Sequence, residues 1–216
     1  MIGIGSRCLF LAASCVAAFP AARSDAQVPR FDTLIVRTYD PQRLVGDLVT
    51  AASRTTDEIM RHAGLVVSWR HCDLPVAAHD PCHLPVAANH LVVRMAAAPA
   101  TGMPGVLGFT YVDRSPNRGW LATVFGDRLI ALADRTRLPR EVLIGRAMAH
   151  ELGHLLLESS AHAKHGFMQA AWSDAMLLRD RPSDWLFMPR EAAQMRASLL
   201  ARSRALPNDL LARRDR

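Results

Sequence analysis

Residues 139–157 read PREVLIGRAMAHELGHLLL, and this stretch decides the fold. Its apolar side chains recur every three or four positions, which is the period of an amphipathic α-helix. Pro139 stands in the first turn, where the missing N–H of proline costs nothing. The apolar stripe consists of Val142, Leu143, Ala147, Met148, Leu152, Leu155 and Leu156. We therefore predict a helix over 139–157 that buries one of its faces.

The motif HELGH lies inside this helix, from His150 to His154. Side chains four residues apart share one helical face, so both imidazoles can bind a single zinc ion. Glu151 lies about 100° further around the helix, where it can take a proton from a water bound at the open zinc position. The spacing therefore predicts a zinc-dependent hydrolase with Glu151 as its general base.

A catalytic zinc ion needs a third protein ligand, and three residues beyond the motif are candidates. Glu158 shares roughly the face of the two histidines, but its carboxylate would lie too far along the helix axis to complete a tetrahedron. Residues 158–161, ESSA, can end the helix and fold the chain back, which would bring His162 under the metal. His165 is the alternative third ligand. We expect one zinc ion per chain.

The sequence before this helix predicts five strands and one further helix from its β-branched and apolar runs. Asp40 and Pro41 open a helix that we expect to run to His62, where Gly64 stops it. A last helix is expected over 189–203, after an irregular segment. The strands are expected at 33–39, 65–69, 91–95, 106–112 and 120–125, the last two as a hairpin.

Residues 1–26 have the pattern of an export signal. Arg7 gives a positively charged start, 8–19 are apolar, and small residues follow, so cleavage would leave Gln27 as the first mature residue. Lipidation at Cys15 is the alternative, and either route leads to a secreted or periplasmic protein. The expected organisation is a signal peptide over 1–26, one domain over 27–204 and a flexible tail over 205–216.

Export also bears on the cysteines, because only Cys72 and Cys82 would remain in the mature chain. An even pair of thiols in an oxidising compartment most simply forms a disulfide. The alternative is a zinc knot that adds the neighbouring His71 and His83. The nine-residue spacer between the cysteines fits no common structural zinc site, so the disulfide is the stronger interpretation.

Composition excludes several classes of protein. The 216 residues are 50% hydrophobic and 21% charged, with a mean hydropathy of +0.06, which fits neither a multi-span membrane protein nor a disordered chain. The formal net charge is +6, and Lys164 is the one lysine. The arginines are scattered without runs or interleaved aromatics, so we expect no nucleic-acid partner. We expect a monomer with no membrane span.

Beyond HELGH the chain has a downstream histidine and then Gly166-Phe167-Met168. Together with the expected order of strands and helices, these residues resemble the metzincin clan of zinc metallopeptidases. The resemblance implies an α+β zincin fold with a mixed five-stranded sheet, an active-site helix, a methionine turn at Met168 and a C-terminal helix. A narrower resemblance is to small exported bacterial proteins taken to be zinc proteases, carried by Trp69, Cys72, Cys82 and segments 121–129, 150–157 and 162–168.

The chain departs from the fuller clan pattern, HExxHxxGxxH, at two positions. That pattern would place glycine at 157 and histidine at 160, where this chain has Leu157 and Ser160. His162 therefore comes two residues late, and a longer turn must absorb the difference. No tyrosine follows Met168, so the tyrosine that assists the metal in some metzincins is absent.

These features predict an exported zinc endopeptidase whose partner is a peptide or protein substrate. The resemblance implies that the substrate binds extended along an edge strand, for which 107–112 is the candidate. Two other functions stay open. The chain could be a zincin-like domain that binds metal with little proteolysis and serves as a binding or processing partner, or a basic exported protein whose motif is accidental.

Overall fold

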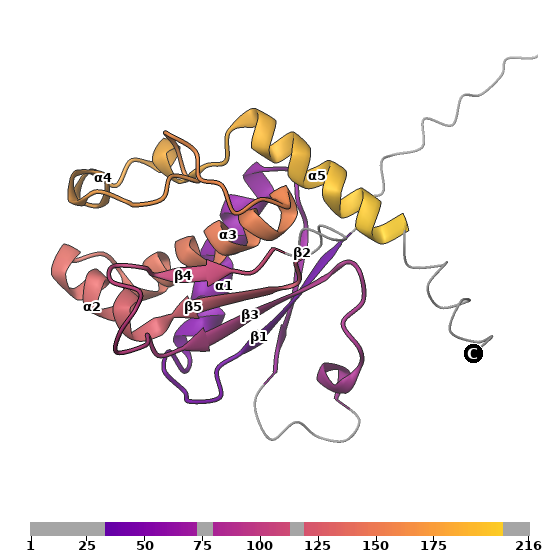
Figure 1. Ribbon diagram of the computed structural model, residues 1–216, viewed down its shortest axis with the longest axis horizontal. Coiled ribbons are helices and arrows are strands. Elements are labelled where there is room, and N and C mark those ends of the chain that lie inside the picture. The colour runs from indigo at the N-terminus through magenta and orange to yellow at the C-terminus, as the bar shows by residue number, and fades with distance from the viewer. Residues whose placement is uncertain (1–32, 73–79, 113–118, 205–216) are drawn as a thin grey trace, which may run out of the picture. The chain divides into compact units, whose positions relative to one another are not determined.

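The computed structural model describes residues 33–72, 80–112 and 119–204 (Figure 1). The expected signal peptide, the expected tail and most of the segment between the two cysteines lie outside the described residues. The strands are β1 Leu34–Tyr39, β2 Val67–His71, β3 His90–Ala96, β4 Gly108–Thr110 and β5 Leu121–Phe125. The helices are α1 Leu48–His62, α2 Gly126–Thr136, α3 Arg140–Leu157, α4 Asp174–Arg179 and α5 Pro189–Arg204, with short 3₁₀ turns at Pro81–His83 and Pro182–Trp185.

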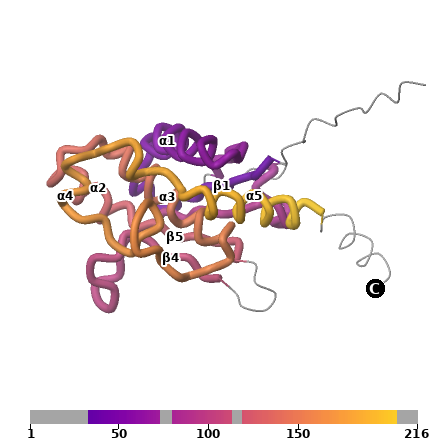
Figure 2. The backbone as a smooth tube through the Cα atoms, turned by 90° about the horizontal axis from the view of Figure 1, so that it is seen from above, coloured from indigo at the N-terminus to yellow at the C-terminus, as the bar shows by residue number. Residues whose placement is uncertain are grey.

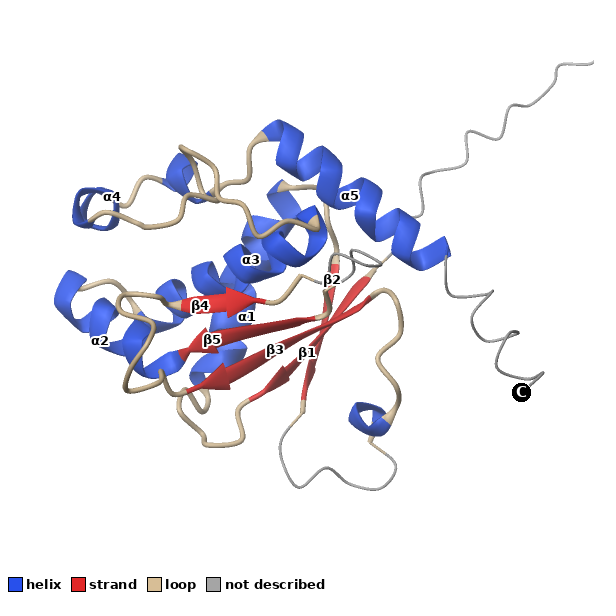
Figure 3. Cartoon of the chain, viewed as in Figure 1, coloured by secondary structure: helices blue, strands red, loops and turns tan. Residues whose placement is uncertain are grey.

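The strands form one mixed sheet in the order β2-β1-β3-β5-β4 (Figure 3). The first four strands of that order are parallel, and β4 pairs with β5 in the antiparallel sense. The prediction of a mixed five-stranded sheet is thereby confirmed, as is the pairing of the last two strands. β4 lies at one border of the sheet, so its outer edge has no neighbouring strand within the described chain.

Helices α1 and α3 pack side by side (Figure 2). They approach closely because α3 carries glycine at the crossing, where a Cβ on Gly145 would lie 2.5 Å from the carbonyl oxygen of Ala52. The hydroxyl of Thr56 on α1 donates to the carbonyl of Gly145 at 2.9 Å. The first half of α3 is thus fixed to the core, and its second half carries the HELGH motif.

The helix expected from Pro41 begins seven residues later, at Leu48. Asp40 does accept backbone hydrogen bonds, but from three consecutive N–H groups at 44–46, at 2.8 to 3.0 Å. Its carboxylate therefore closes a loop, in which Arg43 and Gly46 adopt positive φ, instead of capping a helix. At the other end Gly64 adopts φ +76° just beyond α1, as expected for a helix stop.

Two helices were not predicted. α2 follows β5 without a break and has Asp127 in its first turn, a favourable place for a negative charge. Its buried side chains, Leu129, Leu132 and Ala133, have the spacing of a helix. α4 is short, and the hydroxyl of Ser173 caps it.

Cys72 and Cys82 form a disulfide, with their Cα atoms 5.8 Å apart. This pairing agrees with the prediction and leaves no thiolate for the alternative zinc knot. The segment after Cys82 is fixed by buried Arg37, which donates to the carbonyls of Leu84 and Pro85 at 2.6 and 3.0 Å. Within the described residues, no helix is both long and apolar enough to cross a membrane.

Candidate metal centre

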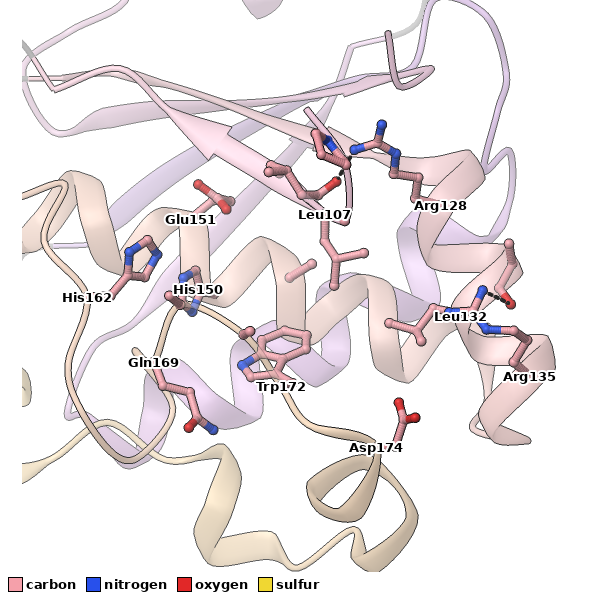
Figure 4. A pocket seen from close by; sticks show the side chains of 18 residues that line it. Leu107, Arg128, Leu132, Arg135, His150, Glu151, His162, Gln169, Trp172 and Asp174 are labelled. Atoms are coloured by element: carbon pink, nitrogen blue, oxygen red, sulfur yellow. Dashed lines mark hydrogen bonds between the residues drawn. The ribbon is translucent and has the colours of Figure 1, made fainter. Parts of the chain in front are cut away.

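Three imidazoles converge beside α3. His150 and His154 come from the helix, and His162 comes from the segment that follows it (Figure 4 labels His150 and His162). The Nε2 atom of His154 lies 3.2 Å from Nε2 of His150 and 3.2 Å from Nε2 of His162. His165 is exposed and takes no part in this cluster. Of the two sequence candidates, the fold therefore brings His162 to the pair.

A left-handed residue at the end of α3 returns the chain to the site. Glu158 has φ +52° and ends the helix, and Ser159 N–H then donates to the carbonyl of His154 at 3.2 Å. Further on, the N–H of Ala163 donates to the carbonyl of Met168 at 2.9 Å, which closes a second turn. The left-handed position is Glu158, and the three residues between it and His162 complete the return of the chain to the site.

Glu158 itself does not reach the cluster. Its carboxylate accepts a hydrogen bond from the hydroxyl of Ser198 on α5 at 3.2 Å and lies 3.8 Å from Arg202. Gln194, also on α5, donates to the carbonyl of Leu157 at 2.8 Å. The C-terminal helix therefore holds the turn that positions His162.

Backbone carbonyls fix the tautomers of the two helical histidines. Nδ1 of His150 lies 3.1 Å from the carbonyl oxygen of Phe167, and Nδ1 of His154 lies 2.8 Å from that of Ser159. A carbonyl oxygen only accepts, so each Nδ1 carries the hydrogen and each Nε2 a lone pair. Two lone pairs that face each other at 3.2 Å repel unless a cation lies between them. This donor set, with carbonyls behind the ligands, fits a zinc ion.

The protonation states also suit metal binding. Burial, joined by the positive charges that His154 and His162 can carry, lowers the pKa of His150 to about 3, against a smaller opposing effect of the hydrogen bond to Phe167. Burial likewise lowers the pKa of His154. Both rings are therefore neutral at pH 7, which is the form that binds a metal.

Glu151 is buried against the edge strand. Its Oε2 accepts a hydrogen bond from the hydroxyl of Thr110 at 2.6 Å, and a Cβ on Gly108 would lie 2.9 Å from its Oε1. Burial raises the pKa of Glu151 to about 7, while the Thr110 hydroxyl acts in the opposite direction. Neither Gly108 nor Thr110 was a sequence candidate. The expected strand over 106–112 was the only signal, and it did not show which side faces the helix.

Met168 lies against the motif helix and is almost fully buried. A Cβ on Gly153 would lie 2.9 Å from the sulfur of Met168 and 2.7 Å from the ring of Phe187. Phe167 packs edge-on against His150, with ring centroids 5.9 Å apart. Glycine at the fourth position of HELGH thus permits the 167–168 turn to pack directly against α3.

A pocket of about 660 Å³ opens beside these groups (Figure 4). Glu151, His150 and His162 line one end, Leu107 and Trp172 line its walls, and Leu132, Arg135 and Asp174 line the other end. Arg128 supports the wall by donating to the carbonyls of Met103 and Val106, the latter at 2.6 Å. The volume suits a single large side chain or a short peptide segment.

Comparison with solved structures relates this architecture to known zinc peptidases. The chain aligns with archaemetzincin from Methanopyrus kandleri over 80% of its own length and 99% of that protein, with 19% identity and a TM-score of 0.50. The two proteins share a fold. A zinc-dependent peptidase from Methanocorpusculum labreanum aligns over 74% of this chain and 99% of its own, with 15% identity and a TM-score of 0.49. The sequence matches no protein-family model and no curated protein.

Proposed function

We propose that this chain is an exported zinc-dependent endopeptidase. The observation that carries the proposal is the set of three imidazoles whose Nε2 atoms converge beside a buried carboxyl group. His150, His154 and His162 would hold the metal. A zinc ion bound there would act as a Lewis acid toward the scissile carbonyl and acidify a water molecule. Export is supported by the N-terminal sequence pattern and by the disulfide.

Glu151 would serve as the proton carrier. Its carboxylate takes a proton from the attacking water and delivers it to the nitrogen of the departing amine as the peptide bond breaks. Burial raises the pKa of this carboxyl group in the zinc-free fold, which favours uptake of the proton in the first step.

The edge of β4 would bind the substrate backbone. The N–H of Phe125 donates to the carbonyl of Leu107 at 2.8 Å, so by the alternation of an antiparallel ladder the main-chain groups of Phe109 also face β5. Those of Gly108 and Thr110 then face the open edge. An extended peptide can pair with these groups, which places its scissile bond near Glu151 and a neighbouring side chain in the pocket.

Met168 would form the methionine turn of this site. Its sulfur packs against the backbone of Gly153, between the two helical ligands in sequence. Such a contact holds the base of the site without supplying a metal ligand. The role follows from the position of Met168 under the helix and from the turn closed by Ala163 N–H.

Glu151→Gln tests the proposal most directly. We expect wild-type protein purified without chelators to contain one zinc ion and to cleave members of a mixed peptide library. The Gln variant should keep the zinc and lose at least about 10³-fold in cleavage rate, because the proton carrier is gone while the ligands remain. Elemental mass spectrometry and peptide mass spectrometry measure the two quantities.

Glu141→Gln is the matched control, since Glu141 lies in the first turn of the same helix, away from the motif. It should leave both zinc and cleavage unchanged. A wild-type protein that binds zinc but cleaves nothing in the library would favour the zincin-like binding domain over the endopeptidase. A wild-type protein that contains no zinc would contradict both the endopeptidase and the zinc-binding domain.

A further inference from the structure

Thr110 is the one side chain of the edge strand that bonds the Glu151 carboxyl group. Its Oγ1 lies 2.6 Å from Oε2 of Glu151 and 3.2 Å from the main-chain carbonyl oxygen of the same residue. A hydroxyl has a single proton, and the shorter contact to the carboxylate takes it. The longer contact is at most a weak share of the same proton, and it shows that Thr110 lies beside the backbone of α3. Forty-one residues separate the two partners in sequence.

The two oxygens of the Glu151 carboxyl group are therefore not equivalent. Oε2 is engaged by Thr110, whereas Oε1 accepts no hydrogen bond from any residue that the structure describes. Gly108 leaves space for Oε1, since any Cβ there would lie 2.9 Å from it. The pair formed by Gly108 and Thr110 thus fixes both the position and the rotation of the carboxyl plane.

We infer that Thr110 is a positioning residue, which holds Glu151 by Oε2 so that Oε1 exchanges the proton, and which links this geometry to substrate pairing on β4. The inference rests on the proposed function, since Glu151 must be the proton carrier. In the reaction, Oε1 gains the proton that water loses and gives it to the amine nitrogen, while the hydrogen bond from Thr110 to Oε2 persists throughout.

The link to the substrate follows from the strand geometry. The side of Thr110 that bears its hydroxyl faces α3, while its main-chain N–H and C=O face the open edge of the sheet. A peptide that pairs with Thr110 therefore binds the same residue that holds the proton carrier. Pairing would reduce the motion of Thr110, and hence that of Glu151, at the moment when the scissile bond is in place.

Three variants test this inference. Thr110→Val keeps the shape and removes the hydroxyl, and Thr110→Ser keeps the hydroxyl. Thr123→Val is the matched control, because Thr123 lies on the adjacent strand and its hydroxyl contacts Arg94 on the other face of the sheet. We expect Thr110→Val to keep its zinc and its KM within about twofold while kcat falls about 10- to 100-fold.

Thr110→Ser should restore kcat to within about threefold of wild type, and Thr123→Val should leave it unchanged. A kcat of Thr110→Val equal to that of wild type, or a loss equally present in Thr110→Ser, would overturn the positioning role. Crystal structures of zinc-free wild type and Thr110→Val supply a readout without catalysis. The carboxyl group should rotate away from its place over Gly108 in the variant, and an unmoved carboxyl would contradict the inference.

These readouts separate the inference from the function it rests on. If wild type cleaves no peptide, the proposed endopeptidase fails, and the two crystal structures still decide whether Thr110 positions Glu151. If wild type cleaves and Thr110→Val cleaves equally well, the endopeptidase stands and the positioning role fails.

Discussion

Two of the buried polar clusters among the described residues are built differently. In the first cluster, Arg37 on β1 donates to His90 Nδ1 at 2.9 Å and to the carbonyls of Leu84 and Pro85, so donors meet acceptors. Beside α3, His150 and His154 meet each other through nitrogens that both carry lone pairs. In the first cluster the two terminal guanidinium nitrogens of Arg37 find acceptors and only its buried Nε has no partner within the described residues, whereas the second cluster sets like groups against each other and fits a cation.

The comparison shows how burial alone fails to identify a functional site. Burial lowers the pKa of His90 to about 4, with Arg37 and Arg70 contributing, and lowers that of His150 to about 3, so both rings are neutral in the fold. The difference lies in what faces each ring. His90 faces a guanidinium group, which is its permanent partner, while His150 faces other imidazoles and an open pocket.

The largest expected effect comes from removing a lone pair at the second cluster. His154→Ala should weaken zinc binding by about 10²- to 10³-fold, because the central ligand nitrogen of the three is lost. His162→Ala should act in the same way. Competition with a fluorescent zinc chelator measures the affinities.

His165→Ala is the control for these variants, since His165 lies in the same segment but outside the cluster. It should bind zinc like wild type. If His165→Ala lost zinc while His162→Ala kept it, the third ligand would be His165 and the turn after α3 would have to close differently.

The next effect concerns the cluster around Arg37. Arg37→Met should lower the free energy of unfolding by about 2–4 kcal/mol, because several buried carbonyls and His90 lose their donor at once. Zinc affinity should not change. Urea unfolding with the disulfide intact measures the loss, and exposed Arg94→Met on the same sheet is the control. A drop in zinc affinity in Arg37→Met that Arg94→Met does not show would mean that the two clusters are coupled.

The residues of the candidate metal centre that lie on the helix could be predicted from their spacing. The others depend on a turn and on the pairing of strands. His150, Glu151 and His154 follow from the 3.6-residue period alone. His162 could be predicted only by assuming how the chain turns after the helix. That turn depends on a left-handed conformation at Glu158, which glycine adopts more readily than glutamate, so the residue type there did not indicate it. Thr110 could not be predicted, because its contact with Glu151 arises only when β4 is placed next to α3.

The fold shows the same division. The five strands along the chain and the motif helix were predictable because each depends on a run of side chains with a clear pattern, whereas the order of the strands in the sheet was not predicted. The start of α1 was predicted wrongly because Asp40 can cap a helix or a loop with the same hydrogen bonds, and residue type does not distinguish them. α2 was missed although its period is regular, because it follows β5 directly, with no loop between Phe125 and Gly126.

The smallest expected effect is on how the free energy of unfolding of the zinc-free protein changes with pH. The folded-state pKa values of His90 and His150 lie below the ordinary 6.5, so below pH 6.5 the unfolded chain binds more protons and stability falls on acidification. Glu151 opposes this trend, because its folded pKa of about 7 exceeds its ordinary 4.5 and the folded state binds the extra proton between these values.

Glu151→Gln removes that opposing contribution and leaves both histidine clusters intact. Between about pH 4.5 and 6.5, the free energy of unfolding should therefore fall more steeply on acidification in the variant, by up to about 1.4 kcal/mol per pH unit. Urea unfolding with a chelator present measures this slope, and Glu141→Gln should follow wild type. An unchanged slope would mean that Glu151 is ionised in the zinc-free fold, so that the second cluster carries its own negative charge before any metal binds.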